Sequence, residues 1–261
     1  ACLSALQAIE HGWQVALMAP TEILAEQHFK KFSQWLSPLK INIAWLTGSQ
    51  TKKQREAALS DIASGAAQLA VGTHALFQEA VIFKKLGLSI IDEQHRFGVQ
   101  QRLALRKKGD PHDLNLNLHQ LMMSATPIPR TLSMSYYADL DVSTIDELPP
   151  GRTPIVTKLV SDERRDEILQ RVREACTVGK QAYWVCPLIE ESETLQLQTA
   201  NDTFAHMQNT FPDLNIGLVH GRMKPSEKQA VMQAFINNET QLLVATTVIE
   251  VGVDVPNASL M

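Results

Sequence analysis

The sequence predicts an α/β fold of two tandem units, each a mostly parallel sheet with helices on both faces. Three observations support this prediction. Short apolar runs alternate with longer amphipathic stretches, as expected for the strands and helices of βαβ units. A proline-rich segment interrupts the alternation at residues 146–154, and the same rhythm then starts again. The length of 261 residues suits two domains of ordinary size.

The composition is that of an ordinary globular protein. Hydrophobic residues make up 44% of the chain and charged residues 20%, which excludes a disordered chain, a coiled coil and a collagen-like repeat. No apolar run approaches the roughly 18 residues that span a bilayer, so we expect a soluble, cytoplasmic protein. The net charge of -4 offers no general attraction for nucleic acid, so such binding would depend on local groups. Three cysteines without a CxxC pair predict free thiols.

The first unit, predicted to span residues 1–145, opens with a helix that ends at Gly12. Buried apolar runs predict its strands, and the amphipathic or polar stretches between them predict its helices. The predicted strands are residues 15–18, 44–46, 69–71, 88–91 and 121–123, and the predicted helices are residues 21–36 and 52–63. Because the chain opens inside a helix without Met, we expect a fragment that begins within this unit.

The segment DELPPGRTP, residues 146–154, is interpreted as an interdomain linker, with a long surface loop as the alternative. Its three prolines and one glycine cannot continue a helix or a central strand. The second unit is predicted to span residues 155–261 and to be truncated, because the final residues look like the first half of a strand. Its predicted strands are residues 155–160, 183–186, 216–219 and 242–245, and its predicted helices are residues 162–176, 199–211 and 225–235.

Two adjacent carboxylates, Asp92 and Glu93, follow the predicted strand at residues 88–91. Ligands bind at the carboxyl ends of the strands in open α/β sheets. One carboxylate of such a pair can hold Mg²⁺ through water, while its neighbour orients and deprotonates an attacking water. A pair of solvated carboxylates in a turn is the alternative interpretation.

Small hydroxyl residues follow other predicted strands. Ser124 and Thr126 follow one, and the pairs Pro20-Thr21 and Gly72-Thr73 follow two more. Hydroxyls and helix-start amides at these positions suit phosphate oxygens, whereas ordinary helix capping by Thr is the alternative. The eight histidines show no metal-ligand spacing, so a structural zinc site is not expected.

The order of the motifs resembles the motor of superfamily-two helicases. The motifs APTE, TG, GTHAL, DEQH, SATPIPRTL, HGRM and ATTVIEVGVDVP occur in that family's order, and the resemblance covers essentially the whole chain. Within the superfamily, DEQHRFGVQQR together with MSATPIPRTL resembles a group that contains the bacterial branched-DNA helicases and the transcription-repair coupling translocase. The segments DELPPGRTP, VCPLIEESE and VHGRMKPSEKQAVM resemble specifically the bacterial helicases that act on branched DNA. The resemblance implies two RecA-like domains that clamp ATP between them and translocate along DNA. It also implies action on replication forks and Holliday junctions in recombination and repair.

The resemblance assigns catalytic and coupling roles to five residues. Asp92 resembles the Walker B aspartate that holds Mg²⁺, and Glu93 resembles the residue that activates the hydrolytic water. His95 looks like the residue that couples this site to the second domain. Ser124 and Thr126 match the motif that links hydrolysis to DNA movement.

The resemblance also implies binding residues, cofactors and partners. Gly252 and Asp254 match the motif that reaches the nucleotide across the cleft. The residues that match DNA-backbone contacts are Pro20, Thr21, Gly72, Thr73, His220, Gly221, Thr246 and Thr247. The implied cofactors are ATP and Mg²⁺. The implied partner is branched DNA, with single-stranded DNA-binding protein as a further candidate, no membrane partner and a monomeric state.

Two motifs of such motors are not found in the sequence: the phosphate-binding GxxxxGK[ST] and the later QxxGRxxR. The second would supply an arginine finger, worth about 10³–10⁵ in rate in related phosphoryl transfer. We therefore expect the isolated chain to hydrolyse ATP negligibly. Two alternatives stay open. One is the transcription-repair coupling translocase, which more usually reads DEEH in place of DEQH, and the other is a non-catalytic tandem α/β binding module.

Overall fold

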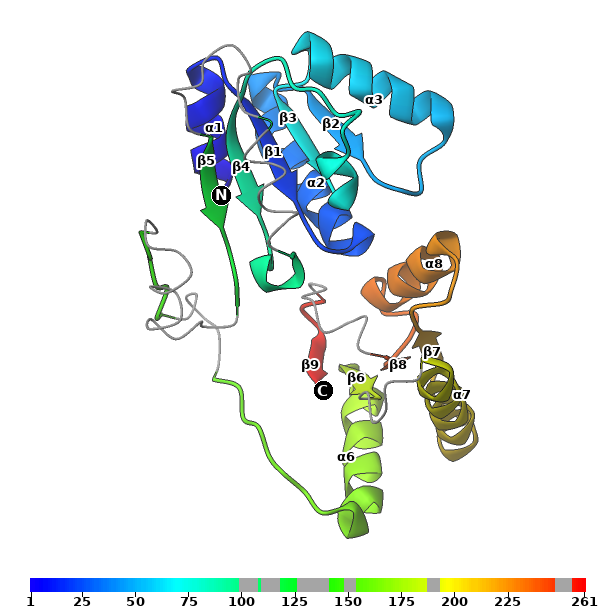
Figure 1. The fold of residues 1–261 in the computed structure, drawn as a ribbon. Helices are drawn as coiled ribbons and strands as arrows, with labels where there is room; N and C mark the ends of the chain where they lie inside the picture. The colour runs from blue at the N-terminus through cyan, green and yellow to red at the C-terminus, as the bar shows by residue number, and fades with distance from the viewer. Residues whose placement is uncertain (99–107, 109–117, 126–140, 148–153, 187–192, 247–254) are drawn as a thin grey trace. The chain divides into compact units, whose positions relative to one another are not determined.

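The computed structural model describes residues 1–98, 108, 118–125, 141–147, 154–186, 193–246 and 255–261 (Figure 1). These residues form two compact units, one holding residues 1–98, 108 and 118–125 and the other holding the described residues from 141 onward. Each unit is built on one parallel sheet, as predicted. The domain bounds and the linker at residues 146–154 stay predictions, because residues 148–153 lie outside the described residues.

The first unit contains a five-stranded parallel sheet with the strand order β2-β3-β1-β4-β5 (Figure 1). Its strands are β1 (Gln14–Met18), β2 (Ile43–Leu46), β3 (Leu69–Gly72), β4 (Leu86–Ile91) and β5 (His119–Met122). All five were predicted, with bounds that differ by no more than a few residues. Because every pairing is parallel, the carboxyl ends of the strands meet at one edge of the sheet.

Helices cover both faces of this sheet. Alternate residues of β1 point to opposite sides, and because they are apolar on both sides, each face needs a covering layer. Val15 and Leu17 pack in one apolar core with residues of α1 (Cys2–Glu10) and α2 (Glu22–Leu36). Ala16 and Met18, which point to the other side, pack in a second core with residues of α3 (Lys52–Ser64). Short 3-10 turns complete the unit at η1 (Ser37–Leu39), η2 (His74–Phe77) and η3 (Gln94–Arg96).

The second unit contains a four-stranded parallel sheet with the order β7-β8-β6-β9. Its strands are β6 (Gln181–Val185), β7 (Ile216–Val219), β8 (Leu242–Ala245) and β9 (Ala258–Leu260). Its helices are η4 (Asp162–Arg164), α6 (Arg165–Thr177), α7 (Glu193–Thr210) and α8 (Pro225–Ile236). Strands β7 and β8 have the predicted bounds, whereas α7 begins earlier than residue 199.

The predicted strand at residues 155–160 is wrong. Residues 154–160 have no regular secondary structure, and the side chains of Ile155, Val156 and Leu159 are exposed. An apolar, β-branched run forms a strand only where a neighbouring strand accepts and donates its backbone hydrogen bonds. None of the strands in the described residues pairs with this segment.

A buried glutamine ties the amino end of the central strand to its surroundings in the first unit. Gln14 is the first residue of β1 and is 5% exposed. Its Nε2 donates to the carbonyl oxygens of Ile62 and Ala67 at 2.9 and 2.8 Å, and its Oε1 accepts from the Lys85 N–H at 2.9 Å. This glutamine clamp therefore joins β1 to the end of α3 and to the segment that enters β4.

The second unit repeats the glutamine clamp. Gln181 is the first residue of β6 and fully buried, and its Nε2 donates to the carbonyl oxygens of Phe235 and Thr240. Its Oε1 accepts from Nδ2 of Asn257 at 3.3 Å. In both units the glutamine Nε2 binds one carbonyl oxygen near the end of a helix and a second one just before the adjacent strand. The repetition supports two units of one design.

A pair of asparagines repeats in the same way. Nδ2 of Asn42 donates to the carbonyl oxygen of Ala66 at 3.1 Å, and Nδ2 of Asn215 donates to that of Glu239 at 3.1 Å. The backbone N–H of Asn42 also donates to Oε1 of Gln68, and the backbone N–H of Asn215 donates to Oε1 of Gln241. Both asparagines stand just before an edge strand, so the same polar contacts hold β2 and β7 to their neighbours.

All three cysteines are free thiols, as predicted. Cys176 and Cys186 are buried, and this burial raises the pKa of both thiols. In the part of the chain that the structure describes, no helix combines the length and apolar character needed to cross a membrane.

We predict that Gln14→Leu and Gln181→Leu each destabilise the unit that contains them. Both changes leave buried backbone groups without the partners that the amide supplied, and each unpaired group costs about 1–3 kcal/mol. The free energy of unfolding should fall by about 2–4 kcal/mol for each variant. Urea unfolding measures this change, with the exposed Gln7→Leu as the control. A glutamine clamp variant that unfolds at the control's urea concentration would show that the clamp is not stabilising.

We also predict that Gly72→Ala destabilises the first unit, because Gly72 ends β3 against the backbone of β2. An added Cβ would lie 1.9 Å from the carbonyl oxygen of Leu46, which cannot move without breaking the sheet. Overpacking of this kind costs about 1–3 kcal/mol or more. Gly48→Ala is the matched control, since its Cβ would meet only Oε1 of Glu22 at 4.0 Å. Thermal unfolding should separate the two variants, and equal midpoints would contradict the packing argument.

Candidate functional site

The first unit brings its predicted site residues to the edge of the sheet where the parallel strands end. Pro20 and Thr21 follow β1, and Gly72 and Thr73 lie at the end of β3. Asp92 and Glu93 follow β4, and Ser124 follows β5. His95 lies in η3, directly after the carboxylate pair. Four further residues singled out from the sequence lie outside the described residues: Thr126, Thr247, Gly252 and Asp254.

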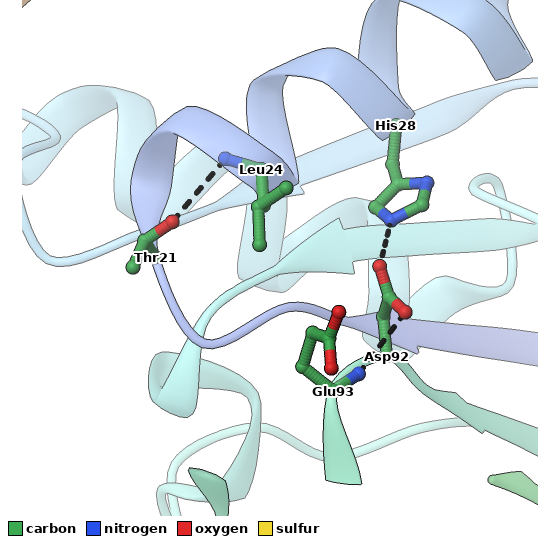
Figure 2. A network of polar contacts seen from close by, with 5 residues as sticks. All are labelled: Thr21, Leu24, His28, Asp92 and Glu93. Atoms are coloured by element: carbon green, nitrogen blue, oxygen red, sulfur yellow. Dashed lines mark hydrogen bonds and ion pairs between the residues drawn. The ribbon is translucent and has the colours of Figure 1, made fainter. Parts of the chain in front are cut away.

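The Asp92 carboxylate is held from two sides (Figure 2). The backbone N–H of Asp92 donates to the carbonyl oxygen of Met18 at 2.9 Å, which continues the pairing of β4 with β1. Its Oδ1 accepts from the Glu93 N–H at 3.0 Å, and its Oδ2 lies 2.7 Å from Nε2 of His28. An ionised carboxylate can only accept, so Nε2 of His28 carries the hydrogen in this contact. The Asp92 side chain is 20% exposed and therefore stays within reach of solvent.

His28 is a site residue that sequence reasoning missed. It lies on α2, 64 residues before Asp92, and no motif in the sequence joins the two. The helical spacing of Thr21, Leu24 and His28 places all three along one side of α2 (Figure 2). The available signal was a histidine at helical spacing from the N-cap of the helix that follows β1.

Glu93 adopts a left-handed backbone conformation, with φ 48° and ψ 53°. Residues with a Cβ rarely adopt it, and such strain costs about 1–3 kcal/mol and is found mainly at functional sites. The conformation turns the chain sharply from β4 into η3, so two consecutive carboxylates stand at the same strand end. The Glu93 side chain is 18% exposed.

Glu93, His95 and Ser124 form a line of close polar atoms. Nδ1 of His95 lies 3.4 Å from Oε2 of Glu93 and 3.4 Å from Oγ of Ser124. Oε2 of Glu93 is buried and has no hydrogen-bond partner among the described residues, and Nδ1 of His95 lies 3.4 Å from it.

Two of the residues that resemble DNA contacts, Thr21 and Gly72, have structural roles in the first unit, whereas the hydroxyl of Thr73 caps no helix. Thr21 is the N-cap of α2, and its Oγ1 accepts from the Leu24 N–H at 3.4 Å, which agrees with the capping alternative. Gly72 allows the close approach of β3 to β2. Thr73 is 2% exposed, and its Oγ1 has no hydrogen-bond partner within the described ranges.

The second unit also places its described candidates at the carboxyl edge of its sheet. His220 and Gly221 follow β7, and Thr246 follows β8 and donates its N–H to the Val219 carbonyl oxygen at 3.2 Å. Lys228 donates from Nζ to the Gly221 carbonyl oxygen at 2.6 Å. Burial, followed by the positive charges of Lys228 and Arg222, lowers the pKa of His220, which favours its uncharged imidazole near neutral pH.

The donor set at the first edge fits a hard cation that keeps most of its water. No group of three or more His, Cys, Asp or Glu side chains that could hold a metal ion occurs among the residues described. Each Asp92 oxygen accepts one hydrogen bond and retains a lone pair, so it can accept another from a metal-bound water. Mg²⁺ is bound in this way, through one or two carboxylates and the phosphates of a substrate.

Comparison with known proteins identifies relatives of the chain. Residues 1–135 match the family description DEAD/DEAH box helicase, and residues 164–261 match Helicase conserved C-terminal domain. The whole chain is 63% identical to the ATP-dependent DNA helicase RecG of Escherichia coli (strain K12) and to that of Haemophilus influenzae. It is 50% identical to the protein of the same name from Aquifex aeolicus. The chain spans 38% of the length of the first two relatives and 32% of the third.

Solved structures give the same picture. A structure of RecG bound to a three-way DNA junction is similar with a TM-score of 0.72 and 40% identity, covering 98% of this chain and 32% of that one. Yeast Dbp5 bound to RNA and ADP BeF3 is similar with a TM-score of 0.67, covering 94% of this chain and 61% of that one, but its 15% identity shows a shared fold alone. The prediction of two tandem RecA-like domains is confirmed. Since the DEAD/DEAH box description matches residues 1–135 of 261, the chain belongs to the DEAD/DEAH box helicase family.

Proposed function

We propose that the whole protein is an ATP-dependent DNA helicase that translocates on branched DNA, such as replication forks and Holliday junctions, in recombination and repair. The observation that carries this proposal is the 63% identity of the entire chain to helicases named RecG. The chain spans 38% of those relatives, so the proposal concerns the whole protein. A carboxylate pair at the carboxyl edge of a parallel sheet agrees with a site for phosphoryl transfer to water.

The first unit supplies the hydrolytic groups in this proposal. Asp92 holds Mg²⁺ through water, and Glu93 orients the attacking water and accepts its proton. When bound with ATP, Mg²⁺ neutralises charge that develops on the phosphate oxygens. His95 lies beside Glu93, and Ser124 lies beside His95, which suits the two residues to report the state of the hydrolytic site. Thr126 belongs with Ser124 in the proposed coupling motif.

The DNA and nucleotide contacts are proposed from both units. The proposed DNA-backbone residues are Pro20, Thr21, Gly72, Thr73, His220, Gly221, Thr246 and Thr247, and the proposed nucleotide residues of the second unit are Gly252 and Asp254. Contacts through amides and hydroxyls read no base sequence and need no strongly basic surface, which agrees with the net charge of -4. A monomeric, cytoplasmic enzyme with single-stranded DNA-binding protein as a further partner is part of the same proposal.

We predict that Glu93→Gln in the whole protein reduces ATP hydrolysis by about 10²–10⁴-fold, because a positioned general base contributes about that factor. ATP turnover is measured with forked DNA, with plain duplex and without DNA. The wild-type protein should be stimulated most by the fork, and Glu93→Gln should lose that stimulation while still folding. Glu10→Gln, on an exposed turn of α1 at the other edge of the sheet, is the control and should behave as wild type.

Two results would contradict the proposal. Turnover that does not respond to DNA would argue against a DNA motor and favour a binding module. Unchanged turnover in Glu93→Gln would show that another group activates the water, and the role of the carboxylate pair would have to be abandoned.

A further inference from the structure

The contact between His28 and Asp92 joins two parts of the first unit that the sequence motifs keep separate. Asp92 follows β4, whereas His28 lies in the second turn of α2, the helix that starts directly after β1. Nε2 of His28 lies 2.7 Å from Oδ2 of Asp92, and the two side chains are 23% and 20% exposed (Figure 2). A contact that short between partly buried groups constrains both side chains.

We propose that His28 is a positioning residue for the metal site, which fixes the Asp92 carboxylate in the orientation that Mg²⁺ requires. The inference rests on the proposed function, because it presumes that Asp92 holds the metal. It adds α2 to the elements that build the hydrolytic site. The sequence motifs place only the capping segment of this helix, Pro20 and Thr21, in a functional role.

The geometry supports the role because of how the carboxylate is anchored. One hydrogen bond, from the Glu93 N–H to Oδ1, comes from the adjacent residue and moves with the strand end. The hydrogen bond from His28 to Oδ2 comes from a different element and therefore fixes the rotation of the carboxylate relative to the sheet. With both bonds made, one lone pair of each oxygen remains for metal-bound water.

The helix is well placed to keep His28 in position. Thr21 caps its first turn, and Leu24 is 5% exposed. The His28 ring lies edge-on to Phe32, with 6.3 Å between the ring centroids, and Phe32 is 3% exposed in the core between α2 and the sheet. The imidazole therefore projects from a capped helix that packs against the sheet through its buried face, and not from a loop. Partners of metal ligands held in this way typically change metal affinity or activity by about 10–100-fold when replaced.

The test measures metal binding without hydrolysis and without DNA. Mn²⁺ is titrated into the whole protein in the presence of the non-hydrolysable ATP analogue AMP-PNP, and free Mn²⁺ is followed by electron paramagnetic resonance. Four variants are compared with wild type. His28→Leu and His28→Phe both remove the N–H donor and differ in the shape of the replacing side chain. His28→Gln keeps an N–H donor on a flexible side chain. His11→Leu is the control, which replaces a histidine at the end of α1, at the other edge of the sheet.

We expect His28→Leu and His28→Phe to weaken Mn²⁺ affinity by about 10–100-fold. His28→Gln should bind within about threefold of wild type, and His11→Leu should match wild type. Urea unfolding of every variant identifies any loss of structure. If one apolar variant fails to fold, the other, together with the glutamine variant, still tests the inference.

Wild-type Mn²⁺ affinity in a folded His28→Leu or His28→Phe protein would overturn the inference. A glutamine variant as weak as the leucine variant would overturn it as well, because shape and not the donated hydrogen bond would then be responsible. Neither result touches the proposed helicase function, which depends on the Glu93 and DNA measurements. Conversely, a wild-type protein that shows no Mn²⁺ binding with AMP-PNP would contradict the proposed function itself.

Discussion

The parallel pairing of β1 with β4 is the contact on which the site depends. Its register sets Met18 beside Ile91, and the next hydrogen bond of the ladder, from the Asp92 N–H to the Met18 carbonyl oxygen, already belongs to the site. The same strand, β1, leads into α2, which brings His28 back to Asp92. A shift of this register by one residue would turn the carboxylate to the other face of the sheet. The apolar residues that fix the register, buried on both faces, therefore determine the chemistry at the edge.

The two edges of each sheet are built differently. At the amino edge, buried glutamines at the start of β1 and β6 bind backbone groups of neighbouring segments, and asparagines repeat a second set of contacts. At the carboxyl edge of the first unit, several buried polar atoms, Thr73 Oγ1 and Glu93 Oε2 among them, have no hydrogen-bond partner in the described segments. Glu93 also holds a strained backbone conformation there. The glutamines and asparagines at the amino edge are thus satisfied, whereas Thr73 Oγ1 and Glu93 Oε2 at the carboxyl edge are left available where ligands are proposed to bind.

Much of the fold could be predicted because parallel strands buried on both faces are continuous apolar runs, and the runs at residues 216–219 and 242–245 coincide with β7 and β8. The run at residues 155–160 looked the same but lacks a pairing strand, which no local pattern reveals. The carboxylate pair could be located from its strand. His28 could not, because its contact spans 64 residues and depends on how α2 packs. Gly72 likewise reveals its packing role only through the carbonyl of Leu46.

The central claim is the proposal that residues at the carboxyl ends of the strands couple nucleotide binding to DNA binding. The most direct measurement is the affinity of the whole protein for AMP-PNP with Mg²⁺, determined by calorimetry with and without saturating forked DNA. Coupled sites must influence each other by equal factors. The account predicts that the fork changes nucleotide affinity by about 5-fold or more, and that AMP-PNP changes fork affinity by the same factor. Nucleotide affinity that is identical with and without the fork would contradict a coupled motor.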